Sequence, residues 1–360
     1  MSDKPRVISG YSSVVLDTLR ILAALMVVSY HLQHHFLSSI KNAPMIENFA
    51  HAAVIIFFVL SGYVIAYTTT IKNRGGVQYM IARFSRLYSI VLPALVITAI
   101  CQYIVYLNSP ELYALYTRGA SWPRYFAAAL FLNEIWFLSA APPMDMPLWS
   151  LGYEFCFYMI FGLWFYRKPG LKYILLPLLA CFIVGPKILS MMSIWLVGYC
   201  AYKLRVPDTK RIILNILVML AFVVAGNLVL YLPALPFQLG TPPLFYASRF
   251  ISDLFIGLFI GIALWLLPEG KAGIKQPQSI ILLRIIADLT FPLYVLHTPL
   301  FILFDAIFNY KVHAIVQLWL PFVFTLSLSF LIGFVLEKQR FFWSKLFKFL
   351  FNYINVKLNI

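Results

Sequence analysis

Charged side chains are scarce in this sequence. Only 11% of its 360 residues are charged, whereas 62% are hydrophobic and the mean hydropathy is +0.85. A soluble domain carries about 25% charged residues, so this composition excludes a water-soluble globule and predicts an all-α, polytopic integral membrane protein. Fixed-period repeats and low-complexity linkers are also lacking, and we therefore expect a single transmembrane domain over residues 1–360.

Cysteine and acidic residues are few as well. The four cysteines lie in or beside apolar runs without CxxC or Cys/His spacing, so they are expected to be packing residues. The 28 basic residues outnumber the 13 acidic ones, but they form short clusters between apolar runs and not the single stripe of a nucleic-acid-binding surface. The N-terminus lacks a short apolar segment followed by a cleavage site, so no removed signal peptide is expected.

Apolar runs of membrane-spanning length recur along the chain. We predict ten spans, near residues 14–35, 49–70, 87–108, 147–166, 171–185, 188–203, 212–231, 249–267, 284–306 and 314–336. The pair 171–185 and 188–203 is short and joined by Gly185-Pro186, so it is either two spans or a re-entrant hairpin. A further apolar stretch at 125–140 contains Asn133 and Glu134, and we expect an interfacial or re-entrant helix there, within an outer loop over 109–146.

The basic residues predict how these spans are oriented. Loops rich in Lys and Arg stay in the cytoplasm, and such clusters occur near residues 72–86, 167–172 and 203–211. Both termini are therefore predicted to be cytoplasmic. The segment 337–360 interleaves Lys with Phe and Leu, which predicts an amphipathic tail along the inner membrane surface, with a solvated basic tail as the alternative.

Ionisable side chains inside spans are energetically costly, so they are candidates for function. In the first span, Arg20 and His31 are eleven residues apart, about 16 Å of helical rise, and share a face. Asp17 lies one turn before Arg20 and is placed to pair with it. The predicted topology puts His31, Glu154 of the fourth span and His297 of the ninth at similar depth in the outer half. A histidine next to a carboxylate is more basic and can take a proton from a hydroxyl.

Some of these residues also have other interpretations. His31 could simply be a buried histidine bonded to a neighbouring helix. With His34 and His35 it has the one-face spacing of a metal site, but no HExxH pattern or nearby carboxylate accompanies them, and we predict no metal. Arg83 and Arg86 precede the third span, where paired arginines either anchor a helix to anionic lipid or clamp a phosphate.

Five separated motifs resemble those of the membrane acyltransferase 3 family. LDTLRILAALMVVSYH at 16–31 is similar to its first-helix signature, FFVLSGYVI at 57–65 to its second-helix motif, and RFSRLYSIVLP at 83–93 to its paired-arginine segment. LWSLGYEFCFY at 148–158 and LYVLHTPL at 293–300 resemble its Trp-Ser-Leu…Glu and Tyr…His-x-Pro motifs. The chain departs from the family at Ile21, where many relatives have Gly, and at Phe155, where an acid is usual. We expect no appended SGNH esterase domain.

The resemblance implies an O-acyltransferase of the bacterial plasma membrane. It would move an acyl group, usually acetyl, from cytosolic acyl-CoA to a hydroxyl of a glycan or lipid-linked sugar. By motif position, His31 would be the catalytic base or a transient acyl carrier, with Arg20 as its partner and Glu154 as the group that orients it. Arg83 and Arg86 would bind the donor phosphates.

The remaining motif residues would support this chemistry. Trp149 and Ser150 would shape the pocket, Asp17 would pair with Arg20, and Tyr294 and His297 would contact the acceptor. No permanently bound cofactor is implied, because acetyl-CoA is a substrate. The main alternative is a multispan transporter or glycolipid flippase, which inverted repeats would favour, and we find none in the sequence. A third interpretation is a non-catalytic sensor or scaffold.

Overall fold

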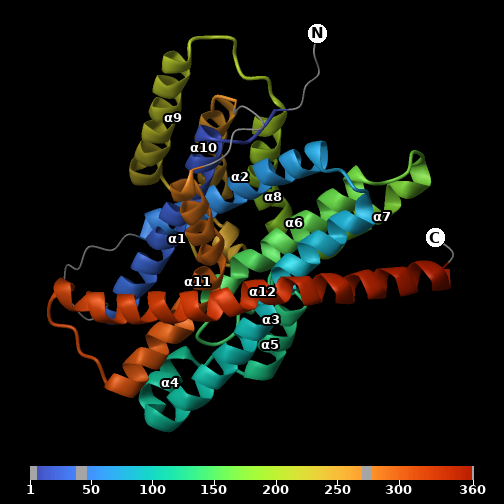
Figure 1. Ribbon diagram of the computed structural model, residues 1–360. Helices are drawn as coiled ribbons and strands as arrows, with labels where there is room; N and C mark the ends of the chain where they lie inside the picture. Colours follow the sequence, from blue (N-terminus) through green and yellow to red (C-terminus); the bar gives the residue numbers. More distant parts are fainter. Residues whose placement is uncertain (1–5, 38–46, 270–276, 359–360) are drawn as a thin grey trace. The chain divides into compact units, whose positions relative to one another are not determined.

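A computed structural model describes residues 6–37, 47–269 and 277–358 of the chain. Within these ranges the regular structure is entirely helical, without strands, and Figure 1 shows the helices in chain order. The α-helices are α1 (Tyr11–Leu37), α2 (Glu47–Ile71), α3 (Gly76–Asn108), α4 (Pro110–Tyr116), α5 (Ser121–Ala129), α6 (Trp149–Phe165), α7 (Leu175–Val184), α8 (Pro186–Lys203), α9 (Arg211–Tyr231), α10 (Phe250–Trp265), α11 (Gln278–Phe308) and α12 (Trp319–Leu358). Short 3-10 helices are η1 (Met146–Leu148), η2 (Leu171–Tyr173), η3 (Phe245–Ala247) and η4 (Ile315–Leu318). The predicted all-helical fold is confirmed.

Seven helical segments of the described chain are long and apolar enough to cross a membrane, which makes this a multi-pass integral membrane protein. They are Tyr11–Leu37, Glu47–Ile71, Gly76–Asn108, Met146–Phe165, Arg211–Tyr231, Gln278–Phe308 and Ile315–Tyr353. The helices α7 and α8 meet this test only as a pair bent by 114°, so they form a broken span or a re-entrant loop, and α10 is a shorter apolar helix. Every predicted span overlaps one of these helices, while the count of ten stays a prediction.

Two segments need closer description. The last span was predicted to end near residue 336 and to be followed by an amphipathic tail, and α12 continues unbroken through this boundary to Leu358. No Pro or Gly follows Gly333, so nothing in this stretch stops a helix. The apolar stretch at 125–140 is only partly helical, because α5 ends at Ala129 and a series of turns follows.

Several predictions fall outside the described residues. The N-terminus, which was predicted to be cytoplasmic, lies in residues 1–5, and the last two residues of the predicted tail are 359 and 360. Part of the basic loop before α11 lies in residues 270–276.

The chain forms two compact units, each built from three chain segments. Unit 1 comprises Met1–Val27, Ile46–Asn73 and Val184–Thr290, and unit 2 comprises Val28–Met45, Arg74–Ile183 and Phe291–Ile360. Each of α1 and α11 therefore supplies residues to both units.

In unit 1, α2 and α8 pack with their backbones in close contact. A Cβ atom added at Gly62 would lie 2.0 Å from the carbonyl oxygen of Trp195, and one at Gly198 would lie 1.8 Å from that of Val59. Small residues allow membrane helices to approach in this way. The fully buried Trp195 side chain also donates a hydrogen bond to Ser61 Oγ at 3.1 Å. The helix α10 packs against both, so these three helices form the centre of unit 1.

In unit 2, α3 packs along α12 and against α6 (Figure 1). Aromatic rings fill these contacts: Phe84 of α3 stacks on Phe155 of α6 with ring centroids 5.5 Å apart, and it meets Phe347 of α12 edge-on. Phe155 stacks in turn on Phe131 at 4.5 Å. This packing fixes the segment of α3 that carries the paired arginines relative to the motif on α6.

Candidate functional site

Two histidines meet in unit 2, one from α1 and one from α11. His31 Nδ1 lies 3.1 Å from His297 Nε2, and the ring centroids are 5.0 Å apart. His297 is fully buried. Its other nitrogen, Nδ1, lies 2.7 Å from the carbonyl oxygen of Tyr294 and 3.2 Å from that of Leu293. His297 was predicted to lie at the same depth as His31, and the structure brings the two rings into contact.

These contacts determine where the protons are. A carbonyl oxygen can only accept, so Nδ1 of His297 carries a proton, and Nε2 of the neutral ring is an acceptor. His31 must then donate from Nδ1 to His297, and Nε2 becomes the basic nitrogen of His31. In a Ser-His-Asp triad a carboxylate fixes the histidine tautomer in this way. Here a second imidazole occupies that position, so His31 is oriented for attack or proton transfer through Nε2.

Tyr294 connects α11 to the start of α6. Its hydroxyl lies 2.7 Å from Ser150 Oγ and donates to the carbonyl oxygen of Pro147 at 3.1 Å. The indole of Trp149 is buried and meets Tyr153 edge-on. Two residues of the Trp-Ser-Leu…Glu motif are thus held beside the Tyr…His-x-Pro motif, within unit 2.

A polar stripe, formed by Ser150, Glu154 and Tyr158, runs along one face of α6. Residues four apart share a helix face, and the stripe extends over about 12 Å of rise. Tyr158 donates a hydrogen bond to the Glu154 carboxylate. The stripe begins beside Tyr294 at Ser150 and ends near Arg83 and Arg86 at Tyr158.

The two arginines of α3 lie at the Tyr158 end of this stripe. The Arg83 guanidinium is 5.7 Å from the centroid of the Tyr158 ring and 6.0 Å from that of Tyr79, and Arg86 is within electrostatic reach of the Tyr158 hydroxyl. Arg83 Nε is buried and has no hydrogen-bond acceptor among the described residues. The two arginines predicted to bind the donor therefore lie near the end of the stripe that contains Glu154 and Tyr158.

A separate ionic cluster lies in unit 1. Asp17 Oδ1 is 3.7 Å from Arg20 Nη1, so the predicted pairing of these residues is confirmed. Arg284 of α11 joins them, with its Nε 3.7 Å from Asp17 Oδ2 and a hydrogen bond to Ser13 Oγ at 2.8 Å. Arg284 was not among the candidate site residues predicted from the sequence.

Asp145, just before α6, is a buried acid that the sequence analysis missed. It is fully buried, and Thr98 of α3 donates to its Oδ2 at 3.3 Å. Its Oδ1 has no hydrogen-bond partner among the described residues. Burial raises the pKa of this carboxyl well above its usual range, against the smaller opposite effect of the Thr98 hydrogen bond. Burial therefore favours the neutral, protonated form of Asp145.

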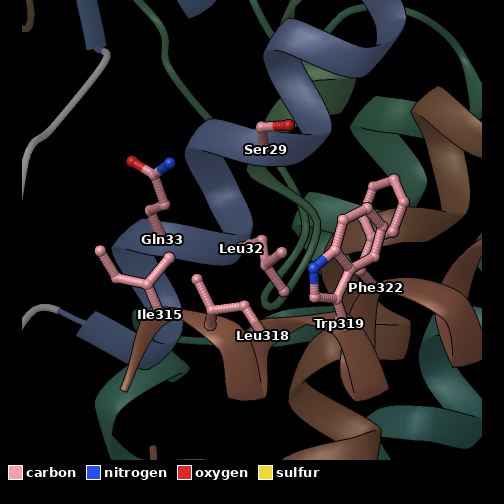
Figure 2. Close-up of a pocket in the computed structure, with 7 residues that line it drawn as sticks. All are labelled: Ser29, Leu32, Gln33, Ile315, Leu318, Trp319 and Phe322. Carbon is pink, nitrogen blue, oxygen red and sulfur yellow. The ribbon is translucent and has the colours of Figure 1, made fainter. Parts of the chain in front are cut away.

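A cleft in unit 2 lies between α1, η4 and the first turns of α12 (Figure 2). It is lined by Ser29, Leu32, Gln33, Ile315, Leu318, Trp319 and Phe322. At about 100° per residue, Ser29 and Gln33 of this cleft lie about 200° around α1 from His31, on the opposite face of the helix. The cleft is thus not part of the histidine site. Among the described residues no group of three or more His, Cys, Asp or Glu side chains is arranged to hold a metal ion.

The model of the acyltransferase 3 family, described as "Acyltransferase domain", matches residues 14–338, and the chain belongs to this family. The predicted membership of this family is thereby confirmed.

The chain is also similar to the O-acetyl transferase of Shigella phage Sf6, with 30% identity over 176 residues. This similarity covers 42% of the chain and 46% of the phage protein, so the chain spans about half the length of that relative. No solved structure matches the chain significantly. Neither comparison supports the alternative of a transporter or flippase.

Proposed function

We propose that this protein is a bacterial plasma-membrane O-acetyltransferase with ten spans and both termini in the cytoplasm. It transfers acetyl from cytosolic acetyl-CoA to a hydroxyl of a cell-surface glycan or lipid-linked sugar. The observation that carries the proposal is the His31–His297 contact, because it leaves Nε2 as the basic nitrogen of His31 in a chain of the acyltransferase 3 family. The phage relative, named as an O-acetyl transferase, supports the acetyl group.

In the proposed reaction, His31 carries the acyl group between donor and acceptor. Nε2 attacks the thioester carbonyl, the C–S bond breaks, and coenzyme A leaves as the thiolate. The resulting acyl-imidazolium keeps its Nδ1–H bonded to His297, which stabilises the positive charge. The acceptor oxygen then attacks the acyl carbon, the N–C bond breaks, and the hydroxyl proton passes to a base. His31 returns to its neutral form.

Arg83 and Arg86 are proposed to hold the donor phosphates. They are three residues apart on α3, which puts both guanidinium groups on one face, and planar guanidinium groups bind phosphate oxygens in pairs. The buried Arg83 Nε supports a ligand role, because a surface lipid anchor would not need a desolvated donor. Glu154 contributes negative charge along the stripe, and Arg20, held by Asp17, keeps its predicted part in catalysis.

The test uses full-length protein in lipid nanodiscs with [14C]acetyl-CoA. When the reaction is stopped with acid, wild-type protein is expected to carry 14C label. It should pass this label to an envelope glycan fraction from cells that lack the protein. His31→Ala should do neither. The matched control is His34→Ala, since this exposed histidine lies three residues further along the same helix, and it should behave as wild type.

A cellular measurement separates this function from transport. Mass spectrometry and proton NMR of envelope glycans should show an acyl ester in cells with wild type or His34→Ala protein. The signal should vanish with His31→Ala or without the protein. Equal acylation in all four strains, with a difference only in glycan export, would refute the enzyme and favour a transporter.

A further inference from the structure

A second histidine of α1, His35, connects three helices in unit 2. Its Nδ1 lies 2.6 Å from the hydroxyl oxygen of Tyr116 at the end of α4, and its Nε2 lies 3.1 Å from Asp305 Oδ2 in the last turn of α11. The His35 side chain is only 7% exposed and that of Asp305 is 24% exposed. These partners are 81 and 270 residues away in sequence, so the cluster is a product of the fold.

The proton positions in this cluster follow from the partners. A carboxylate accepts, so Nε2 of His35 carries the ring proton and donates to Asp305. Nδ1 is then an acceptor, and Tyr116 donates its hydroxyl proton to it. The order carboxylate, imidazole, hydroxyl is that of a catalytic triad, with a phenol in place of the serine. Burial and the nearby Asp305 charge raise the pKa of Tyr116 to about 12. The phenol therefore stays neutral, and it can pass its proton to His35 only while it receives a proton from another hydroxyl.

This cluster lies beside the histidine pair. His35 is four residues after His31, one turn and about 6 Å further along α1. Asp305 is eight residues after His297, two turns along α11. The faces of α1 and α11 that bring His31 to His297 therefore also bring His35 to Asp305, and both contacts belong to unit 2.

We propose that Asp305, His35 and Tyr116 form a second acid–base site that takes the proton of the acceptor hydroxyl. The inference rests on the proposed function, because His31 cannot serve as this base while its Nε2 holds the acyl group. As the acceptor oxygen bonds to the acyl carbon, its proton moves to the Tyr116 oxygen, and the Tyr116 proton moves to His35 Nδ1. The N–C bond to His31 breaks with its electrons returning to Nε2. The positive charge passes from His31 to His35, where Asp305 stabilises it.

The ligand of this site is a hydroxyl-bearing acceptor. Tyr116 donates its own proton to His35, so its oxygen presents lone pairs that can accept an O–H from a sugar. A purely structural role, in which the cluster fastens α4 to α1 and α11, makes different predictions. A fastening needs only the hydrogen bonds, whereas proton transfer also needs the basicity of the imidazole.

His35→Gln separates these roles. A glutamine can accept from Tyr116 through Oε1 and donate to Asp305 through its amide, but it cannot take a proton at neutral pH. Tyr116→Phe removes the hydroxyl and keeps the ring. Tyr113→Phe is the matched control, because this tyrosine lies one turn earlier on α4. Each variant is assayed in nanodiscs with [14C]acetyl-CoA and the glycan fraction from cells that lack the protein.

With His35→Gln and Tyr116→Phe, we expect the label on the protein to reach the wild-type level. Transfer to glycan should fall by about 100- to 10,000-fold, the usual contribution of general acid–base catalysis. Tyr113→Phe should transfer normally. Glycan transfer at the wild-type rate by His35→Gln would overturn the proposal and leave a structural fastening. Equal loss of protein label and glycan transfer would overturn it too. By contrast, label on His31→Ala protein at the wild-type level would refute the proposed function itself.

Discussion

The close contact of α2 and α8 gives a quantitative prediction for Gly198→Ala. The added Cβ would lie 1.8 Å from the Val59 carbonyl oxygen, whereas real Cβ contacts essentially never fall below 3.0 Å. The shortfall is 3.0 − 1.8 = 1.2 Å, and the obstacle is backbone, so the two helices must separate by about that distance. Overpacking of this kind destabilises by about 1–3 kcal/mol. We expect the upper end, about 3 kcal/mol, because no side chain can rotate away; this is roughly a 150-fold change in the unfolding equilibrium.

The assay is reversible unfolding by SDS in mixed micelles, followed by far-UV circular dichroism. Gly226→Ala on α9 is the matched control, since a Cβ there meets nothing within 4 Å. Alanine is the better helix former by about 1 kcal/mol, so Gly226→Ala should be neutral or slightly stabilising. If Gly198→Ala unfolds at the same SDS concentration as Gly226→Ala, the inferred backbone contact between α2 and α8 is wrong.

Three further predictions concern single side chains. Arg83→Lys keeps the charge but loses the planar fork, so KM for acetyl-CoA should rise about tenfold with little change in kcat, as steady-state kinetics will show; an unchanged KM contradicts phosphate binding. His297→Leu removes the acceptor for His31 Nδ1–H and should slow glycan acetylation by about 100-fold or more. His297→Gln keeps an acceptor and should retain more activity. Equal rates for both variants would argue against the view that His297 fixes the tautomer of His31. The raised pKa of Asp145 means that the folded state binds a proton that the unfolded state releases above about pH 4. The free energy of unfolding therefore falls as pH rises from about 4 toward the pKa of the folded state. Asp145→Asn should remove this loss and be at least as stable as wild type at pH 7 in SDS titrations. A less stable variant would argue that the carboxylate is ionised in the folded protein.

Hydropathy predicted the positions of the membrane helices because a bilayer demands long apolar helices. It did not predict where α12 ends. The length of an apolar segment indicates where the chain leaves the membrane, but a helix can continue beyond that point. The chain after residue 336 becomes more polar without a residue that breaks a helix, so α12 continues to Leu358. The turns after α5 could not be predicted from hydropathy, because an apolar stretch outside a span need not form a helix.

The candidate residues were predictable, but their partners were not. Depth along the membrane suggested that His31, Glu154 and His297 lie together. Depth does not fix the rotation of each helix about its axis, so it did not predict the contact of His31 with His297 or the hydrogen bond from Tyr158 to Glu154. Two spacings in the sequence indicate the His35 cluster. His35 follows His31 by four residues on one helix, and Asp305 follows His297 by eight residues on another.

The length of the polar stripe on α6 limits which acyl donors can react. With phosphates at Arg83 and Arg86 and the acyl group at His31, as proposed, the donor must bridge an interval that includes the stripe's helical rise of about 12 Å. A long arm between phosphate and acyl carbon meets this demand. Acetyl phosphate, in which the two groups share one oxygen, can occupy only one end at a time. Donor choice would therefore depend on molecular length, without any need to recognise the acetyl group itself.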